Sequence, residues 1–332
     1  MRGGRAALVV VLGIVVLLVA GCGSGGDGAS DADVGRATTV SHKFGTTTIE
    51  GTPQRVVAAS SQWVDALLEL GIQPVAYLSA GDSGDDRGLY PWEQGMSTDA
   101  VELDRAAMRS AGAALPAEQI AALEPDLILG AWQIADQSMF DRLAALAPTI
   151  GPLGDAQVDS WQDQLTVLGR VFGVEDRAAQ IVQESNDAVS SLASRLPGLH
   201  GRTAVLAQFL VDAQQIVVVA DPDDGASAVF ESLGLSLPAP LVAEAGATGG
   251  RLTLSPERVD ALDADLLVML PNGGTEADLL ALPGFAQLPS VEQGGLAVVD
   301  YPTVVGFNTP SSSSIAYSLE RITPQLEKLG AA

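Results

Sequence analysis

Residues 115–130 read LPAEQIAALEPDLILG, and residues 254–269 read LSPERVDALDADLLVM. Aligned without gaps, the two stretches share Leu, Glu, Ala, Leu, Asp and Leu at the same positions. Each predicts a short helix followed by a buried strand. Such segments also arise by chance in a chain rich in Ala and Leu, but the shared Glu and Asp favour a true repeat. The repeat predicts two halves built on one α/β plan.

The chain before the first repeat predicts a β-α-β unit. RVVAA (55–59) predicts a buried strand, WVDALLEL (63–70) a helix that stops at Gly71, and IQPVAYL (72–78) the next strand. An earlier strand is expected over 46–50.

Two helices are expected between the two halves, over residues 161–172 and 175–196. The second would measure about 33 Å, long enough to run across two lobes. The alternative is one more surface helix within a single lobe.

The N-terminus predicts export and lipid attachment. Arg2 and Arg5 precede the apolar run AALVVVLGIVVLLVA (6–20), which has the layout of a secretory signal and is too short to span a bilayer. The string LVAGC (18–22) resembles a bacterial lipobox, which implies cleavage before Cys22 and its lipidation. Cys22 is the only cysteine, and lipidation explains a lone cysteine in an exported chain. The alternative is an ordinary signal peptide with an incidental thiol. Residues 23–37, GSGGDGASDADVGRA, predict a flexible tether.

Charge and composition exclude several classes of function. The chain has a formal net charge of −24, and loss of the signal removes two arginines, so the mature surface would repel nucleic acid. His42 and His200 are the only histidines, and no zinc, dinucleotide, P-loop or nucleophile-elbow motif is present. We therefore expect no bound metal site and no cofactor.

The sequence resembles the iron-siderophore and cobalamin-binding lipoproteins of ABC importers over residues 38–330. The resemblance rests on FGTTTIEGTPQRVVAASS, DALLELGIQP, LYPW, AEQIAALEPDLIL and APTIGP. The actinobacterial branch looks closest, judged from LYPW and NTPSSSS. The resemblance implies an α/β fold of two Rossmann-like lobes joined by one long helix, with a ligand cleft between them. The expected division is a signal peptide over 1–21, a lipidated tether over 22–37, an N-terminal lobe over 38–172, an interdomain helix over 173–198 and a C-terminal lobe over 199–332.

The same resemblance assigns partners. It implies a monomer on the extracytoplasmic face of the cell membrane that captures a ferric siderophore and hands it to an ABC permease. Glu118 and Glu257, at matching repeat positions, are assigned to permease docking. Each would also complement a helix dipole, since each lies in a predicted first turn. The two roles are compatible.

Candidate ligand contacts follow predicted strands, because open α/β lobes bind ligands at the carboxyl ends of their strands. They are aromatic or amide side chains, although any of the aromatics could instead pack in a core. The set is Trp63, Tyr90, Trp92, Trp132, Gln133, Phe209, Phe307 and Asn308.

Charge also narrows the ligand. Lysine occurs only at Lys43 and Lys328, and an acidic protein repels anions, so a neutral or cationic ferric hydroxamate is favoured. The candidate cleft arginines are few: Arg87, Arg105, Arg109, Arg142 and Arg251. Iron, if carried, should arrive already chelated.

Three alternatives remain open. The first is a cobalamin receptor, since an aromatic cleft suits a corrin equally well. The second is an exported hydrolase that relies on carboxylates alone. The third is a structural or adhesive lipoprotein with an empty cleft.

Overall fold

Five short parallel strands form the first sheet, in the order β5-β4-β3-β6-β7. The three residues of β3 and of β6 are all buried, as expected of parallel strands covered on both faces. The strands are β3 (Val56–Ala58), β4 (Ala76–Tyr77), β5 (Val101–Glu102), β6 (Leu127–Leu129) and β7 (Thr149–Ile150). The structure is a computed structural model that describes residues 37–110, 115–156, 158–248 and 250–331.

An antiparallel hairpin and five helices complete this N-terminal lobe, which we define as residues 37–172. Helix α1 begins at the cap residue Ser60, whose hydroxyl accepts a hydrogen bond from the Trp63 N–H. It is followed by Gly71 in the left-handed conformation, φ 75°, which favours glycine. The elements are β1 (Ala37–His42), β2 (Gly45–Glu50), α1 (Ser61–Glu69), α2 (Arg105–Ser110), α3 (Ala117–Ala122), α4 (Gln137–Ala144) and α5 (Trp161–Phe172), with a 3-10 turn at Gly81–Ser83.

The second sheet has the order β10-β9-β8-β11-β12. Its strands β8, β11 and β12 are parallel, whereas β9 runs antiparallel to both of its neighbours. The strands are β8 (Ala204–Leu210), β9 (Gln215–Val219), β10 (Arg251–Leu254), β11 (Leu266–Asn272) and β12 (Leu296–Val298).

Helices surround the second sheet and form, with it, the C-terminal lobe, residues 197–331. They are α7 (Gly225–Ser232), α8 (Ala239–Thr248), α9 (Glu276–Leu280), α10 (Pro289–Gln293), α11 (Tyr301–Asn308) and α12 (Ser312–Gly330). Short 3-10 helices lie at η2 (Pro197–Leu199), η3 (Pro256–Leu262) and η4 (Phe285–Gln287).

The two repeat segments occupy equivalent places. The first forms α3 and β6, and the second forms η3 and the first half of β11. Both β6 and β11 are fourth in their sheets, beside the central strands β3 and β8. The predicted fold of two α/β lobes is therefore confirmed. The second repeat's helix is 3-10 rather than α-helical, with Arg258 outside helical geometry.

The aspartate shared by the repeats performs the same task in each lobe. Asp126 accepts hydrogen bonds from the N–H groups of Gln54 (2.7 Å) and Arg55 (2.8 Å), just before β3. Asp265 accepts from the N–H (2.8 Å) and the hydroxyl (3.0 Å) of Thr203, just before β8. Each carboxylate therefore fixes the start of the central strand of its sheet.

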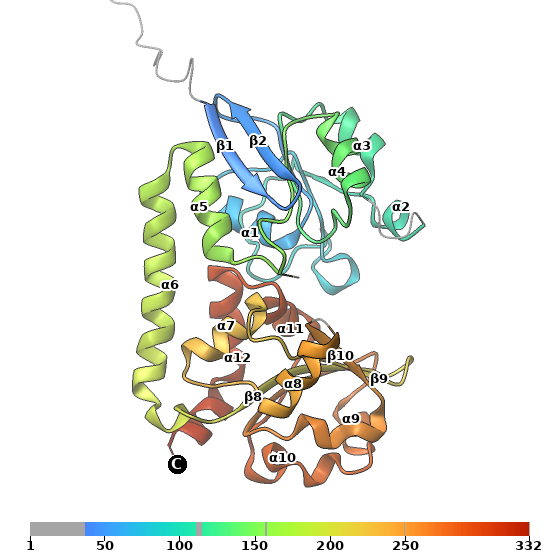
Figure 1. The fold of residues 1–332 in the computed structure, drawn as a ribbon, viewed down its shortest axis with the longest axis vertical. Coiled ribbons are helices and arrows are strands. Elements are labelled where there is room, and N and C mark those ends of the chain that lie inside the picture. The colour runs from blue at the N-terminus through green and yellow to red at the C-terminus, as the bar shows by residue number, and fades with distance from the viewer. Residues whose placement is uncertain (1–36, 111–114, 157, 249, 332) are drawn as a thin grey trace, which may run out of the picture. The chain divides into compact units, whose positions relative to one another are not determined.

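Helix α6 (Glu175–Arg195) lies between the two lobes in the sequence, within one residue of its predicted bounds. It packs against α5 of the N-terminal lobe and against α7 and α12 of the C-terminal lobe (Figure 1). One apolar cluster runs continuously from Trp63 and Leu67 through Val189 of α6 to Phe307 and Ile322. Two further clusters lie on the opposite faces of the two sheets. The lobes therefore share part of one core.

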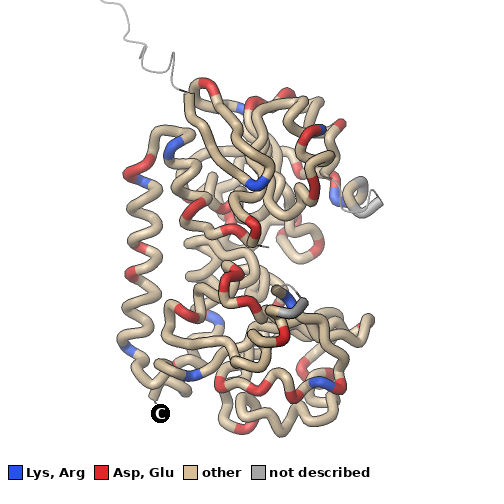
Figure 2. The backbone as a smooth tube through the Cα atoms, in the orientation of Figure 1, with Lys and Arg blue, Asp and Glu red and all other residues tan. Residues whose placement is uncertain are grey.

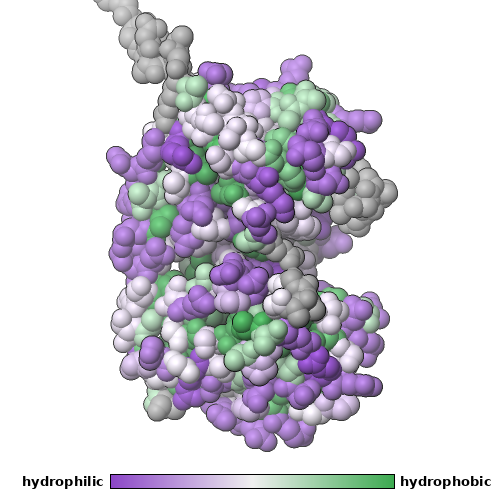
Figure 3. All heavy atoms as spheres, viewed as in Figure 1, coloured by the Kyte–Doolittle hydropathy of each residue, from purple (hydrophilic) through white to green (hydrophobic). Residues whose placement is uncertain are grey.

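The charged residues are distributed as the composition requires. Figure 2 shows acidic residues along both lobes and far fewer basic ones. Hydrophilic side chains cover most of the face shown in Figure 3, and the apolar ones are scattered in small patches.

Within the described residues, no helix has the length and apolar character needed to cross a membrane. The predicted signal peptide, Cys22 and tether lie outside the described residues, except that Ala37, expected in the tether, begins β1.

The repeat aspartates lead to a stability prediction. Asp126→Asn should lower the free energy of unfolding by roughly 2 kcal/mol, because it weakens two charge-assisted hydrogen bonds to backbone N–H groups. Chemical denaturation measures this change. The exposed Asp86→Asn should change stability by less than about 0.5 kcal/mol. Equal stability of both variants would show that the carboxylate does not fix the strand.

Candidate ligand-binding site

The carboxyl ends of β3 and β6 present polar and aromatic groups side by side. Trp132, in the turn after β6, has 53% of its surface exposed, an unusual exposure for a tryptophan. Its neighbour Gln133 is buried, and its side-chain oxygen has no hydrogen-bond partner in the structure. A buried amide oxygen without a partner is costly and so is expected to find a water or ligand donor. Of these two predicted residues, Trp132 is open to solvent, whereas the Gln133 amide oxygen is enclosed.

Tyr90 and Trp92 form a stacked aromatic pair, with ring centroids 4.7 Å apart and an interplanar angle of 6°. The Trp92 indole N–H donates to Asp65 Oδ2 of α1 (2.9 Å), which fixes the ring. The same ring meets Tyr317 of α12, 5.0 Å between centroids, so this pair reaches the C-terminal lobe.

Tyr301, at the start of α11, faces the same region from the C-terminal lobe. It has 39% of its surface exposed. Burial raises the pKa of Tyr90 well above its usual value, and the nearby phenol of Tyr301 raises it further, whereas Arg105 lowers it. Tyr90, Arg105 and Tyr301 are therefore close enough to interact. Tyr301 was missed as a site residue, although it closely follows the strand β12, as the rule used for the others requires.

Three predicted aromatic contacts are buried instead. Trp63 is fully buried, and its indole N–H donates to the Gly130 carbonyl (2.8 Å). Phe209 was expected to follow a strand, but it lies within β8, which continues to Leu210, and packs in the core of the C-terminal lobe. Phe307 was expected in a loop but lies in α11, fully buried against Phe230. In this structure all three pack, and we leave them out of the proposed site.

Asn308, at the end of α11, helps to hold an arginine. Its side-chain oxygen accepts from Arg251 Nη1 (3.3 Å) and its carbonyl from Nη2 (3.4 Å). Arg251 also pairs with Asp224, the cap of α7, through Nε (3.0 Å) and Nη2 (3.3 Å). The Asp224 side chain is 2% exposed and that of Arg251 19%. The guanidinium is therefore largely buried, and its charge is balanced.

The other candidate arginines are also engaged. Arg87 donates to the carbonyls of Met96 and Ser97, and Arg105 to that of Ser79. Arg142 contacts the Met139 sulfur at 3.6 Å. The side chain of Arg109 lies outside the described residues.

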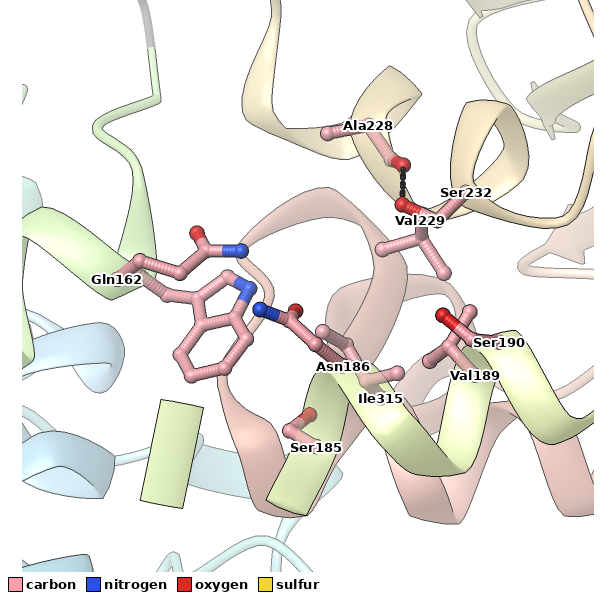
Figure 4. Close-up of a pocket in the computed structure, with 10 residues that line it drawn as sticks. Gln162, Ser185, Asn186, Val189, Ser190, Ala228, Val229, Ser232 and Ile315 are labelled. Atoms are coloured by element: carbon pink, nitrogen blue, oxygen red, sulfur yellow. Dashed lines mark hydrogen bonds between the residues drawn. The ribbon is translucent and has the colours of Figure 1, made fainter. Parts of the chain in front are cut away.

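Pockets lie where the two lobes meet. One of about 340 Å³ lies between residues 153–163 and 222–228, and no lysine or arginine is among the described residues that line it. Five of its lining residues are acidic: Asp155, Asp159, Asp163, Asp223 and Asp224. A neighbouring pocket of about 330 Å³ has a neutral lining in which Gln162 of α5 points toward Asn186 of α6, with Ser190 one turn further along α6 (Figure 4). The described residues that line these two pockets are therefore acidic or neutral.

Glu118 and Glu257 are both exposed, in the first turns of α3 and η3. Arg258, next to Glu257, forms a two-point ion pair with Glu244 (2.8 and 3.0 Å). This pairing keeps the Arg258 charge from cancelling that of Glu257. Both glutamates are accessible to a partner.

Three carboxyl groups are buried between α1, the loop after Tyr90 and the start of α12. Asp65 and Glu93 are almost fully buried. Burial raises the pKa of Asp65 well above its usual range, and the charge of Glu93 adds to the effect. Burial likewise raises the pKa of Glu93 to about 7, against hydrogen bonds that lower it. Glu69 accepts from the N–H (2.7 Å) and hydroxyl (2.6 Å) of Ser313, which ties α1 to α12.

Comparison with known proteins gives the family. The periplasmic binding protein family matches residues 94–302, and the chain belongs to this family. This membership confirms the predicted class, a solute-binding protein rather than an enzyme.

Relatives cover most of the chain. The probable siderophore-binding lipoprotein YfiY of Bacillus subtilis is 26% identical over 267 residues, 79% of this chain and 77% of that protein. The Fe(3+)-citrate-binding protein YfmC of the same organism is 26% identical over 314 residues, 92% of this chain and 93% of its own.

Solved structures agree with the fold. A periplasmic solute binding protein from Mycobacterium smegmatis has a TM-score of 0.71 at 26% identity, covering 89% of this chain and 99% of that one. Streptococcus pneumoniae PiaA, solved with ferrichrome, has a TM-score of 0.73 at 21% identity, covering 88% and 98%. At that identity the second likeness shows the fold alone.

The buried carboxyl groups make stability depend on pH. Folding raises the pKa of Glu93 from 4.5 to about 7, so the folded protein keeps a proton that the unfolded chain loses between these values. The resulting stabilisation is complete below about pH 4.5 and is lost as the pH rises through about 7. We expect the free energy of unfolding to fall by roughly 2 kcal/mol between about pH 5 and pH 8.

Glu93→Gln should make this slope shallower and be more stable than the wild type at about pH 8, because the amide needs no proton, while Asp65, whose pKa burial also raises, keeps part of the slope. Denaturation at several pH values measures the slope. The exposed Glu50→Gln should keep the wild-type slope. If Glu93→Gln also keeps it, Glu93 is not the titrating group.

Proposed function

We propose that this protein captures a ferric siderophore between its lobes and delivers it to the permease of an ABC importer. The observation that carries the proposal is the contact of aromatic rings across the lobes, Trp92 against Tyr317, with Tyr90 stacked on Trp92 and Trp132 exposed in the turn after β6. Broad aromatic faces with few polar groups suit a bulky chelate. The curated names of relatives, a siderophore-binding lipoprotein and a ferric citrate-binding protein, support the same class of ligand.

The ligand we favour is a neutral or cationic hydroxamate chelate. The pocket between residues 153–163 and 222–228 is acidic, and the Arg251 charge is balanced by Asp224. An anionic chelate would meet an unfavourable potential there. Against this preference, the Arg105 guanidinium donates to one carbonyl, that of Ser79, and YfmC is named for ferric citrate.

Iron would reach the site as a chelate. Among the described residues, no group of three or more His, Cys, Asp or Glu side chains is arranged to hold a metal ion. The siderophore therefore would supply the ligands of the iron, and the protein would recognise the outside of the complex.

Delivery requires a location and a docking surface. We propose that Cys22 carries lipid and holds a monomer on the extracytoplasmic face of the membrane, in line with the lipoprotein names of YfiY and YhfQ in Bacillus subtilis. Glu118 and Glu257 would then dock one lobe each onto the permease, since both are exposed at equivalent repeat positions.

Ligand capture can be tested by titrating residues 23–332 and following the tryptophan fluorescence. The ligands to titrate are ferrichrome, ferrioxamine B, ferric dicitrate, ferric enterobactin and cobalamin. We expect saturable quenching by ferrichrome or ferrioxamine B. Trp132→Ala should weaken this binding about tenfold, the loss of one aromatic contact. Leu280→Ala, which removes an exposed apolar side chain of α9 outside these pockets, should bind normally. Binding of cobalamin alone would replace the siderophore proposal, and binding of none would refute it.

The docking assignment has a separate test in transport. Glu118→Arg combined with Glu257→Arg should abolish uptake of the bound chelate, because two attractive charges become repulsive. Affinity in solution should remain unchanged, since both residues lie away from the aromatic groups. The matched variant Glu50→Arg should transport normally. Normal uptake by the double variant contradicts the assignment.

A further inference from the structure

Arg251 makes more hydrogen bonds than the other described arginines of the C-terminal lobe. It lies on the side of this lobe that faces the N-terminal lobe. Arg251 neighbours Asn308, and the next residues, Thr309 and Pro310, contact Ser61 and Gln62 of α1. Asp224 caps α7, and a Cβ added to its neighbour Gly225 would lie 3.3 Å from the Asp159 and Val158 carbonyls of the N-terminal lobe. The Arg251–Asp224 pair is therefore part of the junction between the lobes.

Four hydrogen bonds fix the guanidinium, two to the Asp224 carboxylate and two to Asn308. A guanidinium has five N–H donors, so this arrangement leaves about one of them for any other partner. The side chain of Asp224 is almost completely buried, which removes it from competition with water. The Arg251–Asp224 pair can therefore stay intact, with its two charges balanced, when a ligand enters.

Asp224 also has a helix-capping role. Its Oδ1 accepts from the Ala226 N–H (2.9 Å), and it lines the acidic pocket between the lobes. Asparagine caps helices as well as aspartate does. The charge of Asp224 can therefore be removed while its cap and an acceptor for Arg251 are kept.

We propose that Asp224 determines the charge of the chelate that the protein accepts, by neutralising Arg251 at the junction of the lobes. This inference rests on the proposed function. With the pair intact, a ligand meets no net positive charge from Arg251, and the neighbouring aspartates disfavour anions. With Asp224 neutral, Arg251 is a partly buried cation without a counter-charge, and an anionic chelate gains an attractive partner.

The test is the binding of two chelates of different charge to Asp224→Asn. Affinity for anionic ferric dicitrate should rise about tenfold over wild type, whereas affinity for neutral ferrichrome should change by less than about threefold. The gain should shrink as salt is raised from about 0.05 M to 0.5 M, because it is electrostatic. Adding Arg251→Gln to Asp224→Asn should abolish the gain.

Glu244→Gln is the matched control. It also removes one carboxylate paired with an arginine of the same lobe, Arg258, but at an exposed site. It should leave the ratio of the two affinities unchanged. Thermal unfolding of each variant checks that the fold is kept. The double variant, Asp224→Asn with Arg251→Gln, leaves no unpaired buried charge.

The outcomes separate the two proposals. If Asp224→Asn alters both affinities by the same factor, or Glu244→Gln shifts their ratio equally, the inference is wrong while siderophore capture stands. If the wild type binds no ferric chelate at all, the proposed function fails and the inference fails with it.

Discussion

One carboxylate per lobe fixes the geometry on which the site depends. Asp126 and Asp265 each accept hydrogen bonds from N–H groups just before a central strand, β3 in one lobe and β8 in the other. Desolvation raises the pKa of Asp265, but the hydrogen bonds from Thr203 and Arg202 outweigh it and hold that pKa below its ordinary value. With its first residues fixed, each parallel strand ends at a set place. The turns that follow β3 and β6 are thereby brought together.

The chemistry of the proposed site combines wide aromatic contact with balanced charge. Aromatic rings contribute contact area at little entropic cost, and here they come from both lobes. Two arginines are neutralised by paired carboxylates. Arg251 pairs with Asp224 between the lobes, and Arg258 pairs with Glu244 beside Glu257. In both places an arginine is neutralised next to a surface that we propose for ligand or permease contact. A net charge of −24 therefore does not mean that individual basic groups are unimportant.

Sequence patterns predicted the elements far better than the directions of side chains. The repeat, the buried runs and the capped helices are local signals, so the two lobes and α6 followed directly from them. Trp63, Phe209 and Phe307 were expected near the ligand but are buried, because strand alternation and helical rotation decide which way a ring points. The contacts of Trp92 with Tyr317 and of Arg251 with Asp224 join residues far apart in the chain. Such contacts leave no local pattern, and only the folded structure brings them together.

The apolar cluster that runs from Trp63 through Val189 to Phe307 has a consequence for cooperativity. Domains with separate cores can melt one at a time, whereas a continuous core links the melting of one part to the other. Residues 37–331 should therefore behave as a single thermodynamic unit. Occupancy of the junction by a solute would then protect both lobes from proteolysis together, including segments distant from the solute itself.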